Sequence, residues 1–306
     1  MKKNKKVKRD KKDKVPPLIH VVIMHVNYCE QGQSLEDMCK KAVDWGFQGI
    51  EFRRTRSGVD ETEDAYLDTL EKAVRKAKLK YTLFGSPGAD CMIFDPAKRI
   101  DEIAATKRFF TKAAERFTLT VNNTFTGSLL NPDKNIPYSQ YDKHGSFIAS
   151  QEQWQWAADG YRELGSFAES LNFSFAFETH MCYLHDTPAA AKKLVDLIGS
   201  SNVGVNLDYG NAVYFADNPS LKDTISMLGS SLKYIHLKNS IESDTKRIPT
   251  ALSEGMINHR EYLRLLTDSG YTGPICIEAP RPGDREVFAK TDLAYIRSVM
   301  KELRIL

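Results

Sequence analysis

Short apolar segments rich in β-branched and aromatic residues alternate along this chain with longer segments in which apolar residues recur every three or four positions. The first pattern predicts buried strands and the second predicts amphipathic helices. We expect strands at residues 18–26, 49–52, 81–84, 118–125, 173–178, 203–208, 234–238 and 274–278. We expect helices at residues 34–45, 62–78, 96–117, 151–171, 187–198, 220–228, 258–269 and 292–303.

Eight strand–helix pairs in strict alternation match the length and rhythm of a TIM barrel. The competing fold is an open doubly wound sheet, which would carry a Gly-rich phosphate-binding turn after its first strand. The segment at that place reads NYCEQGQS and has no GxGxxG pattern. We therefore predict an α/β protein, a (β/α)8 TIM barrel, with one catalytic domain at residues 18–306.

The connection after the fourth predicted strand, residues 126–150, is long and rich in Gly, Asn, Pro and Ser. Loops of this length in compact domains are usually functional or disordered, and this one leaves the carboxyl end of a strand, where barrels carry their active sites. His144 lies in it, followed by Gly145, which allows the backbone to turn. We consider His144 a candidate general base carried over the site by the loop; the alternative is a solvent-exposed histidine.

The charge of the chain is concentrated at its start. The first 14 residues hold nine Lys or Arg and two Asp, which gives +7, so the formal total of +3 leaves −4 for the remainder. Dense like charge is typical of disordered segments. We expect residues 1–17 to form a solubilising tail, the alternative being a contact with nucleic acid or another subunit. The acidic remainder favours neither nucleic acid nor any other polyanion as a partner.

The overall composition, 42% hydrophobic and 27% charged, is that of an ordinary globular protein. No segment approaches the roughly 20 apolar residues of a membrane span, and the start of the chain lacks the features of a signal peptide. The five cysteines show no CxxC spacing, which favours reduced thiols. We expect a cytoplasmic oligomer with no membrane partner.

Four predicted strands end on residues that can bind a metal ion. The segments FAFETH, VNLDYGN, YIHLKN and CIEAP place Glu178, Asp208, His236 and Glu278 at successive strand ends, which meet at one mouth of a barrel. A lone acidic residue there is more often a helix cap or an ion-pair partner, but burying three carboxylates together is costly without a cation. We predict one bound divalent ion, with Mn2+ favoured and Mg2+ or Co2+ as alternatives.

These motifs resemble the sugar phosphate isomerase/epimerase family of xylose-isomerase-like TIM barrels. The resemblance runs from IEFRR through ETH, NLDxGN, IHLKN and LSEGMIN to GYTGPICIE and covers nearly the whole body of the chain. It implies that Glu178, Asp208, His236 and Glu278 bind the catalytic ion and that the two glutamates act as acid and base. The ion would polarise the carbonyl of a keto-sugar while a carboxylate moves a proton α to that carbonyl.

Two departures from the epimerase pattern affect the choice of reaction. Many ketose epimerases place a histidine three residues after the aspartate ligand, where this chain has Asn211, and no arginine cluster indicates a phosphorylated substrate. With the long loop, these features favour a resemblance to the catalytic α subunit of bacterial C-glycoside deglycosidases. Those enzymes cleave 3-oxo-glycosides by β-elimination and pair with a small β subunit. The alternative is a 3-epimerase or an aldose–ketose isomerase acting on an unphosphorylated sugar.

Several polar residues near the strand ends are candidate substrate contacts, each with a structural alternative. His180 would lie at the rim as a substrate contact or a structural hydrogen-bond partner, and Asn211, three positions after Asp208, is a further candidate substrate contact. Glu51 and Arg53 alternate along the second strand, which favours a polar contact low in the mouth. His25 either lines the site or is buried in the core. Lys246 and Arg247, after the seventh strand, either anchor a polar substrate or are exposed.

Two functions of other classes are more remote. An apurinic-site endonuclease shares the barrel but resembles a three-metal site with more histidines than this sequence offers, and a body with charge −4 repels DNA. A non-enzymatic binding barrel would keep the core but would not need four converging metal ligands. We therefore expect an enzyme that acts on a small sugar or glycoside.

Overall fold

The computed structural model describes residues 19–25, 32–85, 88–243 and 246–305. The basic segment 1–17 lies outside these residues. Eight parallel strands form one sheet: β1 Val21–Met24, β2 Gly49–Arg53, β3 Tyr81–Gly85, β4 Val121–Thr124, β5 Ser174–Glu178, β6 Val203–Asp208, β7 Leu232–Leu237 and β10 Ile275–Ile277.

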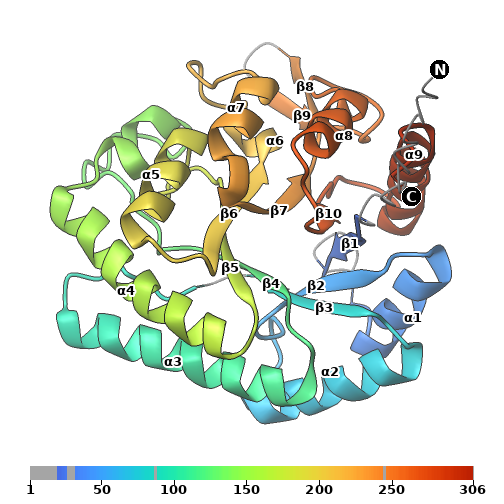
Figure 1. The fold of residues 1–306 in the computed structure, drawn as a ribbon, viewed down its shortest axis with the longest axis horizontal. Helices are drawn as coiled ribbons and strands as arrows, with labels where there is room; N and C mark the ends of the chain where they lie inside the picture. Colours follow the sequence, from blue (N-terminus) through green and yellow to red (C-terminus); the bar gives the residue numbers. More distant parts are fainter. Residues whose placement is uncertain (1–18, 26–31, 86–87, 244–245, 306) are drawn as a thin grey trace, which may run out of the picture.

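The sheet runs in the order β3-β2-β1-β10-β7-β6-β5-β4. It curls into a nearly closed barrel in which the two edge strands, β3 and β4, lie side by side (Figure 1). Among the described residues no backbone pairing joins β3 to β4. At this seam the backbone N–H of Phe84 donates to the side-chain Oδ1 of Asn122 at 2.8 Å instead. The predicted TIM barrel is confirmed, and the doubly wound sheet is excluded by the strand order.

The helices surround the sheet (Figure 1). They are α1 Leu35–Trp45, α2 Glu63–Ala77, α3 Pro96–Arg116, α4 Gln151–Ser170, α5 Pro188–Ile198, α6 Tyr209–Ala212, α7 Leu221–Leu228, α8 His259–Asp268 and α9 Arg285–Glu302. Side chains cap their first turns: Ser34, Thr62 and Thr187, for example, each accept a hydrogen bond from a backbone N–H three residues later. These caps explain why the helix starts lie within a residue of most predicted ones.

Three features differ from the sequence-based expectation. Helix α9 begins at Arg285, seven residues before the predicted start, because Asp284 caps it. An antiparallel hairpin, β8 Ser240–Ser243 and β9 Lys246–Pro249, follows β7 and was not predicted. The long β4–α4 connection contains two short 3-10 helices, η3 Tyr141–Lys143 and η4 Gly145–Phe147.

Apolar residues fill two regions of the barrel. A large cluster lies between the sheet and the helices, and a small one plugs the inside of the barrel with Val22, Leu83, Val121, Ala176, Tyr234 and Cys276. Successive inward-facing residues of a strand are two apart. Two positions after this inner layer the chain has Asn123, Glu178, His236 and Glu278. The polar site therefore rests on an apolar floor.

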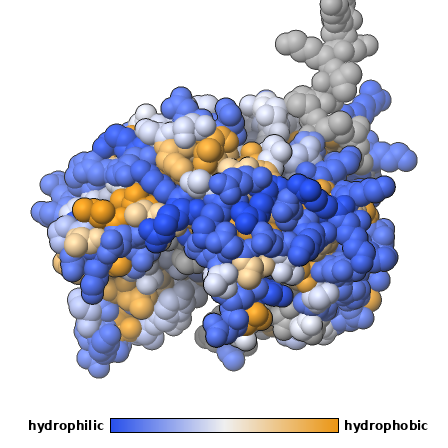
Figure 2. Space-filling model, turned by 90° about the horizontal axis from the view of Figure 1, so that it is seen from below, coloured by the Kyte–Doolittle hydropathy of each residue, from blue (hydrophilic) through white to orange (hydrophobic). Residues whose placement is uncertain are grey.

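The face in Figure 2 is largely hydrophilic, with hydrophobic side chains in separate small areas. None of the helices in the described ranges combines the length and the apolar character needed to cross a membrane.

Candidate active site

The structure brings together the four residues predicted to bind a metal. Glu178 ends β5, Asp208 ends β6, His236 lies in β7 and Glu278 follows β10, and these four strands are neighbours in the sheet. One ligand atom from each side chain lies within 4.8 Å of the others. Three of the residues are at most 2% exposed.

His236 is held from both sides by carboxylates. Its Nδ1 lies 2.6 Å from Oε2 of Glu278, and its Nε2 lies 2.8 Å from Oε2 of Glu51. Glu51 is fully buried and points into the barrel from β2. A side chain at Gly85 would meet Glu51, since an added Cβ would lie 2.2 Å from Oε1. Glu51 thus sets the orientation of the imidazole ring, as carboxylates behind metal-binding histidines do.

Two amides hold Glu178. Asn123 donates from Nδ2 to Oε2 of Glu178 at 2.6 Å, and Asn211 donates from Nδ2 to Oε1 at 3.1 Å. Asn211 can do so because Asp208 caps the short helix α6 and accepts the backbone N–H of Asn211. Asn123 is oriented in turn by the amide of Asn206. Asn211 therefore contacts the candidate base itself in this structure.

Lys238 is a site residue to which the sequence analysis gave no role. Its Nζ lies 2.6 Å from Oδ2 of Asp208 and 3.2 Å from Oε1 of Glu278. It lies two positions after His236, so the alternation of the strand places both on the same side. Its side chain is 22% exposed, and it supplies a fixed positive charge to a cluster of carboxylates.

The buried carboxylates differ in their pKa values. Burial raises the pKa of Glu178 to about 7, and the neighbouring charge of Glu278 adds to the rise. Burial also raises the pKa of Asp208 to about 7 against the opposing effect of Lys238. Burial acts in the same direction on Glu278, but Lys238 and His236 outweigh it and lower the pKa of that carboxyl. Proximity to Glu51 and Glu178 outweighs burial for His236 and raises its pKa.

The cluster suits a divalent cation. Oδ2 of Asp208 is buried and has no hydrogen-bond partner among the described residues, although Lys238 lies close to it. The Lys238 ammonium already approaches this oxygen, but three carboxylates buried together still favour additional positive charge between them. Three carboxylates and one imidazole are the donors that hard and borderline divalent ions prefer. Glu178, Asp208, His236 and Glu278 could hold such an ion.

A cavity of about 240 Å3 opens beside these residues. Four predicted substrate contacts line it: His25, Glu51, Arg53 and His180. His25 accepts a hydrogen bond from Nε of Arg53 at 2.8 Å, and burial, assisted by Arg53, lowers the pKa of His25 to about 4. His25 is thus a neutral residue of the cavity wall.

His180 lies at the rim of the same cavity. Its Nδ1 lies 3.0 Å from the carbonyl oxygen of Met181, and its ring contacts Phe125 and Tyr183 edge-on. The hydrogen bond to the backbone leaves Nε2 for other partners. The bond from Nδ1 to the backbone fits a structural role of His180, and the position of the residue in the cavity wall fits a substrate contact.

His144 has a different setting from the predicted one. It is 2% exposed; Nδ1 accepts the backbone N–H of Asn131 at 2.9 Å, and Nε2 lies 3.2 Å from the carbonyl oxygen of Pro137. With Nδ1 accepting and Nε2 donating, both ring nitrogens are hydrogen-bonded to the backbone of the loop. His144 does not line the cavity beside the four-residue cluster. In this conformation it holds the β4–α4 loop together and is neither exposed nor placed as a base.

The same loop is attached to the segment that follows β5. The backbone N–H of Leu129 donates to the carbonyl of Cys182, and Ser146 donates its N–H to Oδ2 of Asp186. Gly145 has φ +58°, and a Cβ there would lie 2.1 Å from Oδ2 of Asp186. The close approach therefore requires glycine.

Lys246 and Arg247 lie on β9 and not beside the cluster. Lys246 is exposed. Arg247 donates from its guanidinium to the carbonyl oxygen of Val213 and stacks on Tyr214, with its Cζ 4.7 Å from the ring centre. Neither residue lines the cavity at the four ligands, so the structure does not place them as substrate anchors there.

A family model described as xylose isomerase-like TIM barrel matches residues 39–299. The chain belongs to the xylose isomerase-like TIM barrel family. The match covers the strands that carry all four converging residues.

Relatives of the xylose isomerase-like barrel include sugar-processing enzymes. An inosose dehydratase from Clostridium beijerinckii is 24% identical over 150 residues, which are 44% of this chain and 50% of the relative. This chain thus matches about half of that enzyme's length.

Two solved structures share the fold. D-psicose 3-epimerase in the presence of D-fructose superposes with a TM-score of 0.72 at 20% identity, covering 92% of this chain and 99% of the epimerase. A xylose isomerase-like TIM barrel protein from Mycobacterium smegmatis, in complex with magnesium, has a TM-score of 0.73 at 18% identity, covering 95% and 98%. At these identities the likeness shows the fold of the barrel.

Proposed function

We propose that this protein is a divalent-metal-dependent enzyme that removes a proton α to the carbonyl of a keto-sugar. The observation that carries the proposal is the convergence of Glu178, Asp208, His236 and Glu278 within 4.8 Å of one another, on an apolar floor at the carboxyl ends of the strands. These four residues would hold the ion, with Mn2+ favoured and Mg2+ or Co2+ as alternatives. When bound, the ion supplies a Lewis acid for the sugar carbonyl.

The protein's own groups carry the proton. Glu178 ends β5 and Glu278 follows β10, so the two carboxylates stand at opposite ends of the row β10-β7-β6-β5. One carboxylate takes the proton from the carbon next to the carbonyl, and the other delivers a proton to the group that leaves or to the opposite face of the sugar. Asn123 and Asn211 hold both oxygens of Glu178 in place. The Lys238 ammonium adds positive charge where the oxyanion develops.

We propose β-elimination as the outcome, in the form of cleavage of a 3-oxo C-glycoside. The C2–H bond breaks, C1 and C2 form a double bond, and the C1–aglycone bond breaks with its electron pair on the aglycone carbon, which takes up a proton. The likeness to an inosose dehydratase supports an elimination from a cyclic ketone. A small β subunit is expected to accompany this activity.

Epimerisation or aldose–ketose isomerisation of an unphosphorylated sugar is the second candidate. The observation that favours it is the presence of two carboxylates, Glu178 and Glu278, on strands at opposite ends of the row β10-β7-β6-β5. One could remove a proton from one face of the sugar, and the other could return a proton to the opposite face. The fold shared with D-psicose 3-epimerase is compatible with this outcome.

Deuterium exchange distinguishes these outcomes. The Mn2+-loaded protein is incubated in D2O with a 3-oxo C-aryl glucoside and, separately, with free ketoses. We expect aglycone release from the glucoside, and a fall of about 100-fold or more for Glu278→Gln, since general base catalysis is worth at least that factor. Glu163→Gln, an exposed ion-pair residue of α4, is the control. Exchange into a ketose without aglycone release would establish the epimerase, and metal-loaded protein that exchanges neither substrate would refute enolisation.

A further inference from the structure

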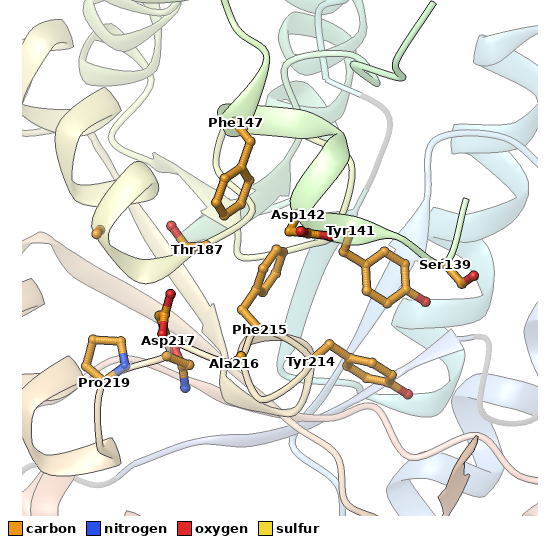
Figure 3. A pocket seen from close by; sticks show the side chains of 12 residues that line it. Ser139, Tyr141, Asp142, Phe147, Thr187, Tyr214, Phe215, Ala216, Asp217 and Pro219 are labelled. Atoms are coloured by element: carbon orange, nitrogen blue, oxygen red, sulfur yellow. The ribbon is translucent and has the colours of Figure 1, made fainter. Parts of the chain in front are cut away.

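A second cavity, of about 480 Å3, lies between the β4–α4 loop and the segment after α6. Aromatic residues line it from both sides: Tyr141 and Phe147 come from the loop, and Tyr214 and Phe215 come from the segment after α6 (Figure 3). The rings of Phe147 and Phe215 are nearly parallel, at an interplanar angle of 16° and 5.8 Å between centres. Sites for small molecules are typically concave and aromatic-lined, with a few polar groups.

The polar residues that line this cavity in the described part of the chain are carboxylates, hydroxyl groups and one amide, and none of them is a cation. Asp142 and Asp217 are exposed carboxylates at its edge, and Ser139 and Thr187 add hydroxyls. Asn218 also lines it, and the Oδ1 atom of Asn218 is buried without a hydrogen-bond partner in the described structure. A buried acceptor of this kind calls for a donor. The lining therefore suits a neutral ring with hydroxyl groups and disfavours phosphorylated or carboxylated ones.

The cavity is joined to the metal-binding cluster by short segments. Helix α6 begins directly after Asp208, and hydrogen bonds continue the helical turn to Phe215. Seven residues in that conformation span about 10 Å. The β4–α4 loop is fixed to the segment after Glu178 through Ser146 and Asp186. Both walls of the cavity therefore stand on the strand ends that carry the cluster.

We propose that this cavity binds a neutral, hydroxyl-bearing six-membered ring that is linked to the reacting sugar. The ring is either the aryl aglycone of a glycoside or a second sugar unit, since both offer an apolar face to aromatic side chains and hydroxyl groups to carboxylates. The proposal rests on the proposed function, because it extends the substrate of that site. In this proposal Arg247 has a structural role. Its guanidinium packs against the ring of Tyr214 and donates a hydrogen bond to the carbonyl oxygen of Val213, and these contacts fix the wall of the cavity formed by the segment after α6.

The test measures binding of sugars that cannot react, so it is independent of turnover. Dissociation constants of phenyl β-D-glucopyranoside, cellobiose and methyl β-D-glucopyranoside are measured by saturation-transfer NMR with the Mg2+-loaded protein. We expect a two-ring probe to bind about tenfold more tightly than the methyl glucoside, as an aromatic contact of this kind provides. A preference for the phenyl probe identifies an aglycone site, and a preference for cellobiose identifies a glycosyl site.

Substitution of Phe147 locates the second ring. Phe147 is 55% exposed, so Phe147→Ala is expected to fold normally, and it should remove the advantage of the two-ring probe while leaving the methyl glucoside unchanged. Phe94→Ala, at a phenylalanine that is 78% exposed and lines neither cavity, is the control. Equal affinity of all three probes, or no effect of Phe147→Ala, would overturn the proposal even if the enzyme enolises keto-sugars. A two-ring preference without keto-sugar turnover would leave the cavity assigned and refute the proposed reaction alone.

Discussion

Replacing Glu51 with Gln tests whether the carboxylate behind His236 prepares that ring for a metal ion. Oε2 of Glu51 lies 2.8 Å from Nε2 of His236, and both side chains are fully buried. Glutamine has nearly the same shape, so it can still accept the Nε2 proton. It lacks the negative charge that fixes the tautomer and makes the imidazole a stronger ligand through Nδ1.

The size of the effect follows from the burial of this pair. Loss of such a partner typically weakens metal binding 10- to 100-fold, which corresponds to about 1.4–2.7 kcal/mol. Among the described residues, Asn123 donates from Nδ2 to Oε1 of Glu51 at 3.5 Å, which is a longer contact than the one to His236, so the charge of Glu51 is directed mainly at His236. We therefore expect an effect near the upper end, with the Kd for Mn2+ raised close to 100-fold.

The assay is calorimetric titration of metal-free protein with Mn2+, alongside thermal unfolding of the metal-free forms. Glu163→Gln makes the same chemical change at an exposed position outside the site and serves as the control. If Glu51→Gln folds normally and binds Mn2+ as tightly as the control variant does, the carboxylate does not act through His236 and the reasoning fails.

Three further substitutions test other parts of the structure. Lys238→Met leaves the carboxylates of Asp208 and Glu278 without the ammonium group, so the metal-free protein should lose about 3 kcal/mol of stability. Added Mn2+ should then raise the Tm of the variant more than it raises the Tm of the parent protein. An unchanged Tm in both the metal-free and the Mn2+-loaded variant would contradict this role of Lys238. His144→Ala removes two hydrogen bonds inside the β4–α4 loop and should cost about 1–3 kcal/mol in denaturant unfolding while α-proton exchange persists; loss of exchange with metal retained would restore His144 as the base. Burial lowers the pKa of His259 to about 4, so below pH 6.5 the unfolded chain takes up a proton that the folded chain does not, and stability falls as the pH drops toward 4. Between pH 6.5 and 5, His259 should lower the free energy of unfolding by about 2 kcal/mol. In His259→Gln the free energy of unfolding should therefore fall by that much less over the same pH range. An identical pH dependence in the variant and the parent protein would show that the ring titrates normally.

Much of the site could be predicted because it follows the repeat of the barrel. Each of the four converging residues closes a strand whose apolar pattern is clear, and parallel strands bring their carboxyl ends to one mouth. The same alternation could have identified Asn123, two positions after the buried Val121, and Lys238, two positions after His236. Neither side chain is a carboxylate or an imidazole, so the pattern that marks the four converging residues does not mark these two.

The rest depends on contacts that no local pattern encodes. The position of His144 is set by backbone atoms 7 and 13 residues away in an irregular loop, and that of Arg247 by a carbonyl 34 residues away. The β8–β9 hairpin carries short, mostly exposed strands with little hydrophobic periodicity, so it gave no strand signal. Sequence periodicity therefore predicts which four residues converge but not which residues form the walls around them.

The seam between β3 and β4 makes the barrel mechanically uneven. In the described part of the chain, a side-chain acceptor, Oδ1 of Asn122, links these two strand edges, whereas neighbouring strands elsewhere in the sheet are joined by rows of backbone hydrogen bonds. Amide protons at these edges are expected to exchange with solvent sooner than those of the β5–β6–β7 row, and a hydrogen-exchange time course would show it. Asn123, which follows Asn122 in β4, donates a hydrogen bond to Glu178. Local opening at the seam would therefore break the hydrogen bond from Asn123 to Glu178 before it affects Asp208, His236 or Glu278.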